Sequence, residues 1–191
     1  AQPEARFFEH NTRGLGTGYN EALERAAGSD RILALVHADV VVADAFAVEK
    51  LSDAMQWADV VGLVGAAAFE AEVEKDAYRW AAWPREALAG AVEHPYGPVT
   101  CWTVFGPTPR RCVILDGLLI AVDMMTIGGV RFDEQFAFHL YDLDFCLSAH
   151  RAGLVCGAVN VYAQHLSRGN YESAAYREAA ARGQRRAPCW R

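Results

Sequence analysis

The sequence predicts an α/β protein: a single domain with a mixed, mostly parallel sheet flanked by helices. Two observations support this prediction. Residues 31–36 and 60–68 are continuous apolar runs, the pattern of strands buried on both faces of a parallel sheet. Helical segments at residues 19–27 and 44–57 alternate with these runs, as in layered α/β folds. The chain has 191 residues, of which 52% are hydrophobic and 22% charged, which suits one globular domain.

Residues 1–70 are expected to form a βαβαβ unit. A short strand at residues 6–9 would lead into a glycine-rich loop at residues 11–18. The helix at residues 19–27 would end at Gly28, since glycine commonly stops a helix. The two apolar strands and the helix between them complete the unit.

The second half of the chain is predicted to be less regular. Residues 70–111 contain several tryptophans and prolines and are expected to be an irregular excursion at the rim of a binding site. Three further strands are expected, at residues 111–115, 118–122 and 154–162. Three helices are also expected, at residues 124–128, 141–152 and 171–182. Residues 132–136 are expected to be a loop. Gly153 is expected to end the helix at residues 141–152.

The charge distribution argues against a nucleic-acid partner. The formal net charge is −6, whereas a nucleic-acid-binding domain usually presents a basic surface. From residue 168 onward, however, six arginines and two glutamates give a local charge of +4. This basic tail is either a solvated face or a contact for the phosphates of a lipid-linked acceptor or an anionic membrane surface.

The cysteines and the hydropathy pattern indicate a cytoplasmic protein, with the inner face of the membrane as an alternative site through the basic tail. The five cysteines are odd in number and include no CxxC pair, which does not suit a disulfide framework or a zinc site. No apolar run approaches the roughly 20 residues of a membrane helix, and residues 1–4 do not resemble a signal peptide.

Polar residues gather just after the predicted strands, where ligands bind in open α/β sheets. His37 and Asp39 are two residues apart, so on a strand both would point to one face and could share a divalent ion. Alternatively, Asp39 caps the next segment and His37 is a hydrogen-bonded structural histidine. His165 follows the last predicted strand, and Asp116 precedes Gly117; a structural histidine and a simple turn are the competing interpretations.

Asp142 and Asp144 open the predicted helix at residues 141–152. A spacing of two separates side chains on a helix by about 200°, so only one of the pair is expected to face a site. The other would cap the helix or interact with its positive end, and capping is the competing interpretation for both residues.

Read in order, these segments resemble family 2 glycosyltransferases, which have the GT-A fold of nucleotide-diphospho-sugar transferases. Residues 32–40 resemble the stretch that ends in the metal-binding DxD-type motif, here in an HxD form. The other segments that carry the resemblance are residues 19–22 (YNEA), 116–122 (DGLLIAV), 132–136 (FDEQF), 141–145 (YDLDF) and 165–170 (HLSRGN). Together they span most of residues 19–170.

The resemblance implies a metal-dependent inverting transfer of a sugar from a UDP- or GDP-linked donor to a saccharide or lipid-linked acceptor. It implies a donor and metal half at residues 1–70, an acceptor and catalytic half at residues 71–170, and a C-terminal helix and tail at residues 171–191. The cofactor would be Mn²⁺ or Mg²⁺. The implied roles are Asp39, His37 and His165 as metal ligands, Asp142 as catalytic base, Asp116 and Trp102 in acceptor binding, and Asn20 in donor binding. An ordinary core tryptophan and a structural asparagine are the competing interpretations for Trp102 and Asn20.

The sequence departs from the family pattern at three places. His37 replaces the first acidic residue of the DxD motif, and Tyr141 stands where most members have glutamate. The family's first strand and helix have no counterpart before residue 19. This last departure leaves two alternatives open: a non-catalytic glycosyltransferase-like binding domain, and a nucleotidyltransferase on a related fold.

Overall fold

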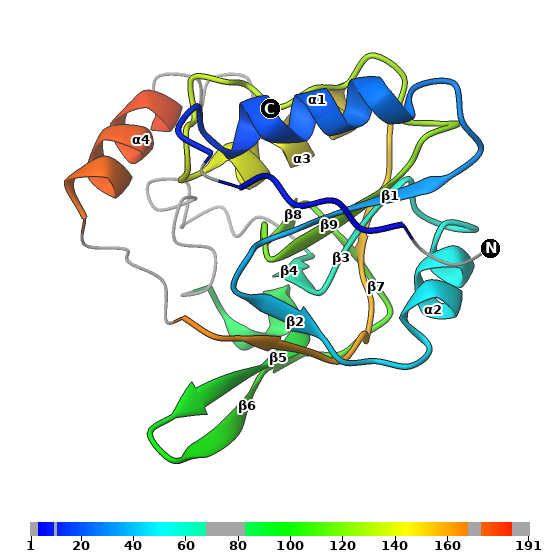
Figure 1. Ribbon diagram of the computed structural model, residues 1–191. Helices are drawn as coiled ribbons and strands as arrows, with labels where there is room; N and C mark the ends of the chain where they lie inside the picture. The colour runs from blue at the N-terminus through cyan, green and yellow to red at the C-terminus, as the bar shows by residue number, and fades with distance from the viewer. Residues whose placement is uncertain (1–3, 10, 68–82, 168–172, 185–191) are drawn as a thin grey trace.

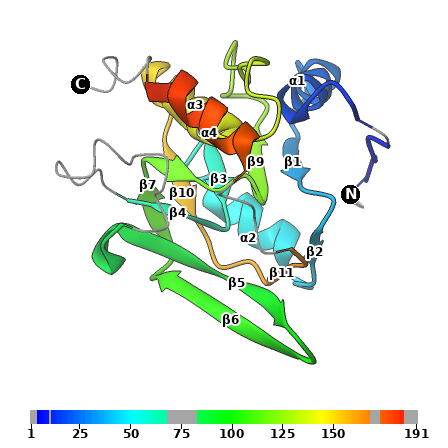
Figure 2. The same cartoon turned by 90° about the vertical axis from the view of Figure 1, so that its left-hand side faces the viewer.

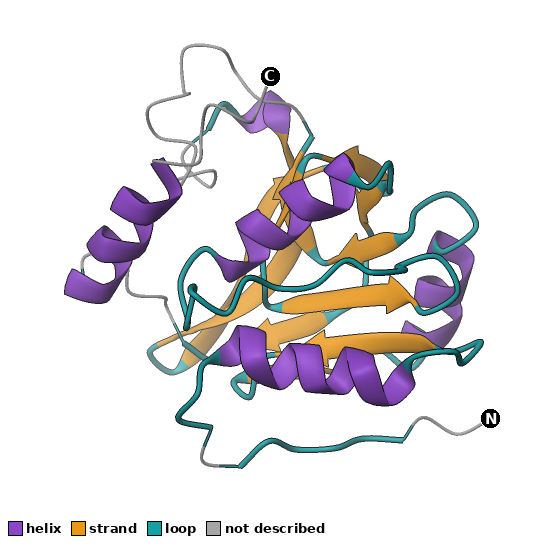
Figure 3. Ribbon diagram, turned by 90° about the horizontal axis from the view of Figure 1, so that it is seen from above, coloured by secondary structure: helices purple, strands orange, loops and turns teal. Residues whose placement is uncertain are grey.

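The computed structural model describes residues 4–9, 11–67, 83–167 and 173–184, and its α/β architecture has two sheets (Figure 1). Seen from above, α1 and α3 lie over the strands (Figure 3). The helices are α1 (Leu15–Ala26), α2 (Ala47–Ala54), α3 (Tyr141–Arg151) and α4 (Ala174–Gln184), with a 3₁₀ turn, η2 (Arg85–Ala87). The strands are β1 (Ile32–Val36), β2 (Val40–Val42), β3 (Val60–Gly62), β4 (Val64–Ala66), β5 (Leu88–Tyr96), β6 (Val99–Gly106), β7 (Arg110–Cys112), β8 (Ile114–Leu115), β9 (Leu119–Asp123), β10 (Cys156–Ala158) and β11 (Ala163–His165).

The sheets are mixed, but the prediction that they are mostly parallel is wrong. One sheet has the order β1-β9-β3-β10-β7, and the other β2-β11-β5-β4-β8 with β6 added on β5. Of the nine strand pairings among the described residues, only β10–β3 and β11–β5 are parallel. Helical segments connect few of the strands; most are joined by short turns, which bring successive strands together antiparallel.

The amino-terminal part differs from its predicted form. Residues 6–9 form no strand, and α1 begins at Leu15, inside the predicted glycine-rich loop. Gly14, at φ 95°, precedes the helix, and a Cβ there would meet the Ala137 backbone at 2.8 Å. Gly14 therefore allows the start of α1 to approach the loop before α3. This tertiary contact outweighs the poor helix propensity of Gly16 and Gly18 inside α1.

The predicted irregular excursion contains the longest strands of the molecule. Residues 68–82 of this segment lie outside the described residues, but β5 and β6 form a hairpin that projects from the body, opposite α1 and α3 (Figure 2). Its turn contains Gly97 at φ 63°. Pro95 is tolerated because it lies near the end of β5, next to the turn, so a proline at this place is compatible with a hairpin.

Some further predictions need correction, and others are confirmed. The predicted strand at residues 60–68 is divided into β3 and β4, which lie in different sheets, whereas the helices predicted at residues 44–57 and 171–182 are present as α2 and α4. Residues 124–128 form turns instead of a helix, and the predicted strand at residues 154–162 is only β10, with β11 following in the other sheet. The strands β1 and β9 lie where they were expected. Helix α3 also does, and it ends before Gly153 at φ 82°.

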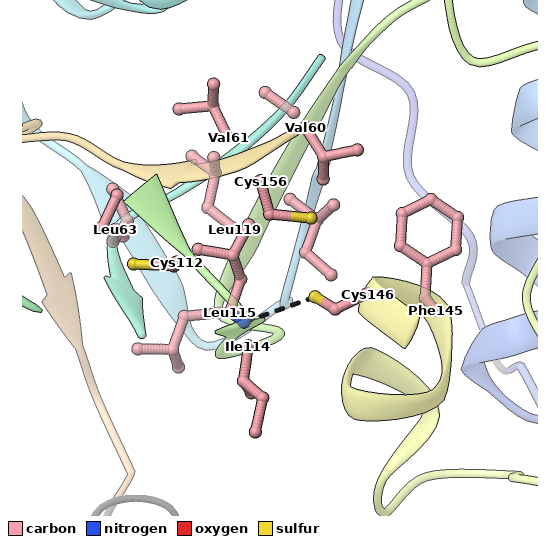
Figure 4. Close-up of a cluster of buried hydrophobic side chains, with 14 of the residues drawn as sticks. Val60, Val61, Leu63, Cys112, Ile114, Leu115, Leu119, Phe145, Cys146 and Cys156 are labelled. Atoms are coloured by element: carbon pink, nitrogen blue, oxygen red, sulfur yellow. Dashed lines mark hydrogen bonds between the residues drawn. The ribbon is translucent and has the colours of Figure 1, made fainter. Parts of the chain in front are cut away.

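One cluster of buried apolar side chains runs from Tyr19 in α1 to Tyr176 in α4. Within it, Cys146 of α3 points toward Leu115 (Figure 4), and Phe145 stacks on Phe132 at a centroid distance of 4.0 Å. The Leu115 backbone amide donates to Cys146 Sγ at 3.3 Å. Packing of α3 against β8 and β10 thus fixes the position of the α3 N-terminus, from which the candidate site is built.

Candidate functional site

Asp39 lies between His37 and His165. Its Oδ1 is 3.9 Å from His37 Nδ1, and its Oδ2 is 3.3 Å from His165 Nε2. His37 and Asp39 were predicted to share one face of a strand, but their closeness has another cause. β1 ends at Val36, and both residues lie in the turn before β2. Antiparallel pairing of β11 with β2 then places His165 opposite Val40, next to this turn.

Two further side chains orient His165. Parallel pairing of β11 with β5 sets Gln164 beside Glu93, and therefore His165 beside His94. His94 Nε2 lies 3.3 Å from His165 Nδ1, while Ser167 Oγ lies 3.0 Å from His165 Nε2. His94 was not selected from the sequence because no local spacing relates it to His165, a residue 71 positions away.

The electrostatics of this trio favour an ionised Asp39 beside a neutral His37. Burial acts to raise the pKa of Asp39, but the hydrogen bond from Ser167 and the nearby His165 and His37 outweigh it, so the pKa is lowered. Burial is the main cause that lowers the pKa of His37, with Asp39 opposing it. Neutral imidazole and carboxylate are the forms that bind a metal ion.

The donor chemistry of the trio suits a divalent cation such as Mn²⁺. Within the described residues, no three His, Cys, Asp or Glu side chains are already arranged as a metal site. The 3.3 Å between Asp39 Oδ2 and His165 Nε2 is nevertheless close to the roughly 3 Å that separates two ligands bonded at about 2.1 Å to one ion. The 3.9 Å to His37 requires a small side-chain adjustment, which the 41% exposed Asp39 side chain permits.

A chain of hydrogen bonds connects this trio to α3. His37 Nε2 lies 2.5 Å from the Tyr141 hydroxyl, which donates to the Gly117 carbonyl at 3.1 Å. The Gly117 backbone amide in turn donates to Asp142 Oδ2 at 2.9 Å. The turn at Asp116-Gly117 thus contacts both of the first two residues of α3.

Asp116 and Asp142 form a pair of interacting carboxyl groups. Backbone amides bind both: Leu118 donates to Asp116 Oδ1 at 3.1 Å, and Leu143 donates to Asp142 Oδ1 at 2.9 Å. Asp144 of α3 is also buried, so burial does not distinguish the two acidic residues of this helix.

Both carboxyl groups of the pair have raised pKa values. Burial, and then the charge of Asp142, raise the pKa of Asp116 to about 7, against the hydrogen bond from Leu118. Burial raises the pKa of Asp142, although the backbone amides of Leu143 and Gly117 act to lower it. A carboxylate with a raised pKa accepts a proton more readily than an ordinary aspartate does, which is the property that a general base needs.

Trp102 lies on the other face of the β5–β6 hairpin from His94. It pairs with Glu93, whereas its neighbour Cys101 pairs with His94, and side chains alternate along a strand. Its indole, half exposed, packs on Tyr162 with ring centroids 5.2 Å apart, and the Tyr162 hydroxyl bonds Glu93 at 2.6 Å. The structure therefore does not bring Trp102 together with the histidines.

Asn20 is buried in α1 and holds the loop at residues 132–134. Its Nδ2 donates to the Phe132 carbonyl and to Glu134 Oε1, both at 3.0 Å, and its Oδ1 accepts from the Phe132 amide at 2.9 Å. Both polar ends of this amide are thus engaged within the protein, and the structure does not place them at the Asp39 trio.

Comparisons with known proteins give no family. No protein-family model matches the chain, and no curated protein matches it. In the described part of the chain, no helix is long and apolar enough to cross a membrane. The basic tail lies partly outside the described residues, because only residues 173–184 of it are described.

Proposed function

We propose that this protein is a metal-dependent inverting glycosyltransferase that moves a sugar from a nucleoside-diphosphate donor to an acceptor hydroxyl. One observation carries the proposal. A potential metal-binding trio and a carboxyl pair with raised pKa values, contributed by distant segments, are connected through His37, Tyr141 and Gly117. In this proposal the trio binds the metal ion that stabilises the leaving diphosphate, and the carboxyl pair supplies the base for the acceptor hydroxyl.

In this proposal, Asp39, His37 and His165 hold a Mn²⁺ or Mg²⁺ ion. When bound, the ion would neutralise the negative charge that develops on the departing diphosphate. His94 contacts Nδ1 of His165 and orients the ring, as the outer partners of metal-binding histidines commonly do. Ser167 contacts Nε2, the nitrogen that faces Asp39, so a bound ion would replace this hydrogen bond.

Asp142 accepts the proton of the acceptor hydroxyl. The hydroxyl oxygen forms a bond to the anomeric carbon on the face opposite the diphosphate, the bond from that carbon to the diphosphate oxygen breaks, and its electron pair leaves with the nucleotide. The proton passes to the Asp142 carboxylate. Asp116, beside it, contributes negative charge to the pair and presents an oxygen to acceptor hydroxyls.

Calorimetric titration of UDP and of GDP, with Mn²⁺ and then with EDTA, tests the donor site. Metal-dependent binding of one nucleotide is expected, and Asp39→Ala should weaken it at least about a hundredfold, since a metal ligand is lost. Asp53→Ala, which removes an exposed carboxylate of α2, is the matched control and should bind like the unsubstituted protein.

Release of UDP or GDP from a panel of nucleotide sugars tests the chemistry. Asp142→Asn should lower turnover by about 10²–10⁴-fold while nucleotide affinity stays the same, because the base acts only in the chemical step. Nucleotide binding without turnover would indicate a non-catalytic binding domain, and pyrophosphate release from a nucleoside triphosphate would indicate a nucleotidyltransferase. If neither UDP nor GDP binds, the proposal is wrong.

A further inference from the structure

Two of the positions at which this sequence departs from the family pattern contact each other. His37 and Tyr141 are 104 residues apart, yet His37 Nε2 and the Tyr141 hydroxyl oxygen are 2.5 Å apart. The Tyr141 side chain is buried, so no solvent competes for this hydrogen bond. The pair therefore acts as one unit, and its protons can be assigned.

The assignment follows from counting donors and acceptors. The Tyr141 hydroxyl has a single hydrogen, and its polar neighbours are His37 Nε2, the Tyr19 hydroxyl and the Gly117 carbonyl. A hydroxyl group and a ring nitrogen can each donate or accept, whereas the carbonyl can only accept. No other group in the described parts of the chain donates to that carbonyl. If Tyr141 donated to His37, the buried carbonyl would lose its hydrogen bond, so the hydroxyl donates to Gly117 and accepts from His37 Nε2–H.

The other histidine nitrogen is then left with a lone pair. Nδ1 faces Asp39 Oδ1 at 3.9 Å, too far for a hydrogen bond that would stabilise the opposite tautomer. A neutral imidazole with hydrogen on Nε2 presents its Nδ1 lone pair to the space beside Asp39.

We propose that Tyr141 is a positioning residue, which holds His37 as the Nε2–H tautomer and so keeps its Nδ1 available to a divalent cation beside Asp39. The last part of this inference rests on the proposed function; the tautomer itself does not.

The surroundings of Tyr141 restrict its hydroxyl to this position. A Cβ on Gly117 would lie 1.9 Å from the hydroxyl oxygen, so only glycine leaves room for it. Tyr19 packs edge-on against the Tyr141 ring at a centroid distance of 5.7 Å, and Phe132 lies at 5.8 Å. On the other side, Phe138 stacks on the His37 ring at 6.0 Å. These contacts restrict the orientations of the Tyr141 and His37 rings.

Nitrogen-15 NMR of the metal-free protein tests the tautomer directly. Long-range ¹H–¹⁵N spectra at pH 8 distinguish the protonated from the unprotonated ring nitrogen, and the His37 signals are identified by their loss in His37→Gln. We expect hydrogen on Nε2 of His37 in the unsubstituted protein. In Tyr141→Phe, which removes the hydroxyl alone, we expect a mixture of tautomers, whereas Tyr162→Phe, whose hydroxyl bonds Glu93 instead, should leave the His37 signals unchanged.

Manganese affinity in the presence of UDP gives the second readout. Tyr141→Phe should weaken it ten- to a hundredfold, the range found when an outer partner of a metal ligand is removed, with the fold intact by circular dichroism. Gly117→Ala, which displaces the hydroxyl without removing it, should weaken it as well. Hydrogen on Nδ1 in the unsubstituted protein would overturn the inference, as would Tyr141→Phe that keeps both the tautomer and the metal affinity. A failure of the unsubstituted protein to bind manganese would instead contradict the proposed function, since the metal-free spectra decide the tautomer.

Discussion

At the scale of single residues, the Asp116–Asp142 pair concentrates the unusual energetics of the site. Neither carboxyl group has a basic side chain as a hydrogen-bond partner among the described residues; backbone amides of Gly117, Leu118 and Leu143 are their donors. Amide hydrogen bonds offset only part of the cost of burying two carboxylates side by side. The pair therefore reduces the stability of the folded protein when both groups are ionised.

Asp116→Asn should stabilise the protein at alkaline but not at acidic pH. The pKa of Asp116 is about 7 in the folded protein, above its ordinary value near 4, so its favourable contribution is complete below pH 4 and is lost as pH rises through 7. Asparagine remains neutral throughout and can keep the bond from the Leu118 amide. Compared with the unsubstituted protein, the variant should gain up to about 4 kcal/mol between pH 4 and pH 8.

Urea denaturation at pH 4, 6, 7 and 8 with EDTA present measures this difference. Asp123→Asn is the matched control, since Asp123 also accepts a backbone amide, that of Met125, at the end of β9. A stability difference for Asp116→Asn that does not change with pH would contradict the assignment.

At the scale of secondary-structure elements, close backbone contact decides where strands can lie. β4 runs between β5 and β8, and Gly65 is at its centre. A Cβ at this position would stand 2.2 Å from the Ile114 carbonyl oxygen, a backbone atom that cannot move away without breaking the β4–β8 pairing. β8 in turn contacts α3, so this glycine helps to set the position of the helix that carries Tyr141 and Asp142.

Gly65→Ala should therefore destabilise the protein strongly. Forcing a methyl group into this contact costs about 1–3 kcal/mol or more, which for a chain of this length lowers the melting temperature by about 3–10 °C. Gly129→Ala is the control: a Cβ there meets nothing within 4 Å. Thermal denaturation followed by circular dichroism compares the two, and equal melting temperatures would show that β4 and β8 are less tightly packed than described.

At the scale of the whole molecule, the candidate site exists only because several segments converge. Asp39 comes from the turn after β1, His165 from the end of β11, His94 from β5, and Asp142 from the start of α3. A ligand that bridges the first two of these would restrain parts of both sheets. Ligand binding to this site is therefore expected to be linked to global stability.

Mn²⁺ and UDP or GDP together should raise the melting temperature. A ligand at about a hundred times its dissociation constant adds about 2.7 kcal/mol, or roughly 5–10 °C for a chain of this length. Differential scanning fluorimetry should show the shift only when metal and nucleotide are both present. The shift should disappear in Asp39→Ala and persist in Asp53→Ala; an equal shift in Asp39→Ala would place nucleotide binding elsewhere.

Local signals in the sequence predicted several parts of the fold correctly. The apolar runs of β1 and β9 and the helix α3 with its terminal glycine follow from contacts among residues a few positions apart, which a sequence displays directly. The closeness of His37 and Asp39 also follows from their spacing, although a turn rather than a strand produces it. The β5–β6 hairpin was missed because its prolines and glycines are signals of irregular structure as well as of tight turns.

Local patterns in the sequence therefore predict the α/β class and the residue types that could bind a metal or accept a proton. The antiparallel pairing of most strands, the contact of His94 with His165 and the contact between His37 and Tyr141 follow only from the tertiary structure. The last two contacts join residues 71 and 104 positions apart. Such pairings are selected by the combined packing of both sheets and α3, and no short window of sequence contains that information.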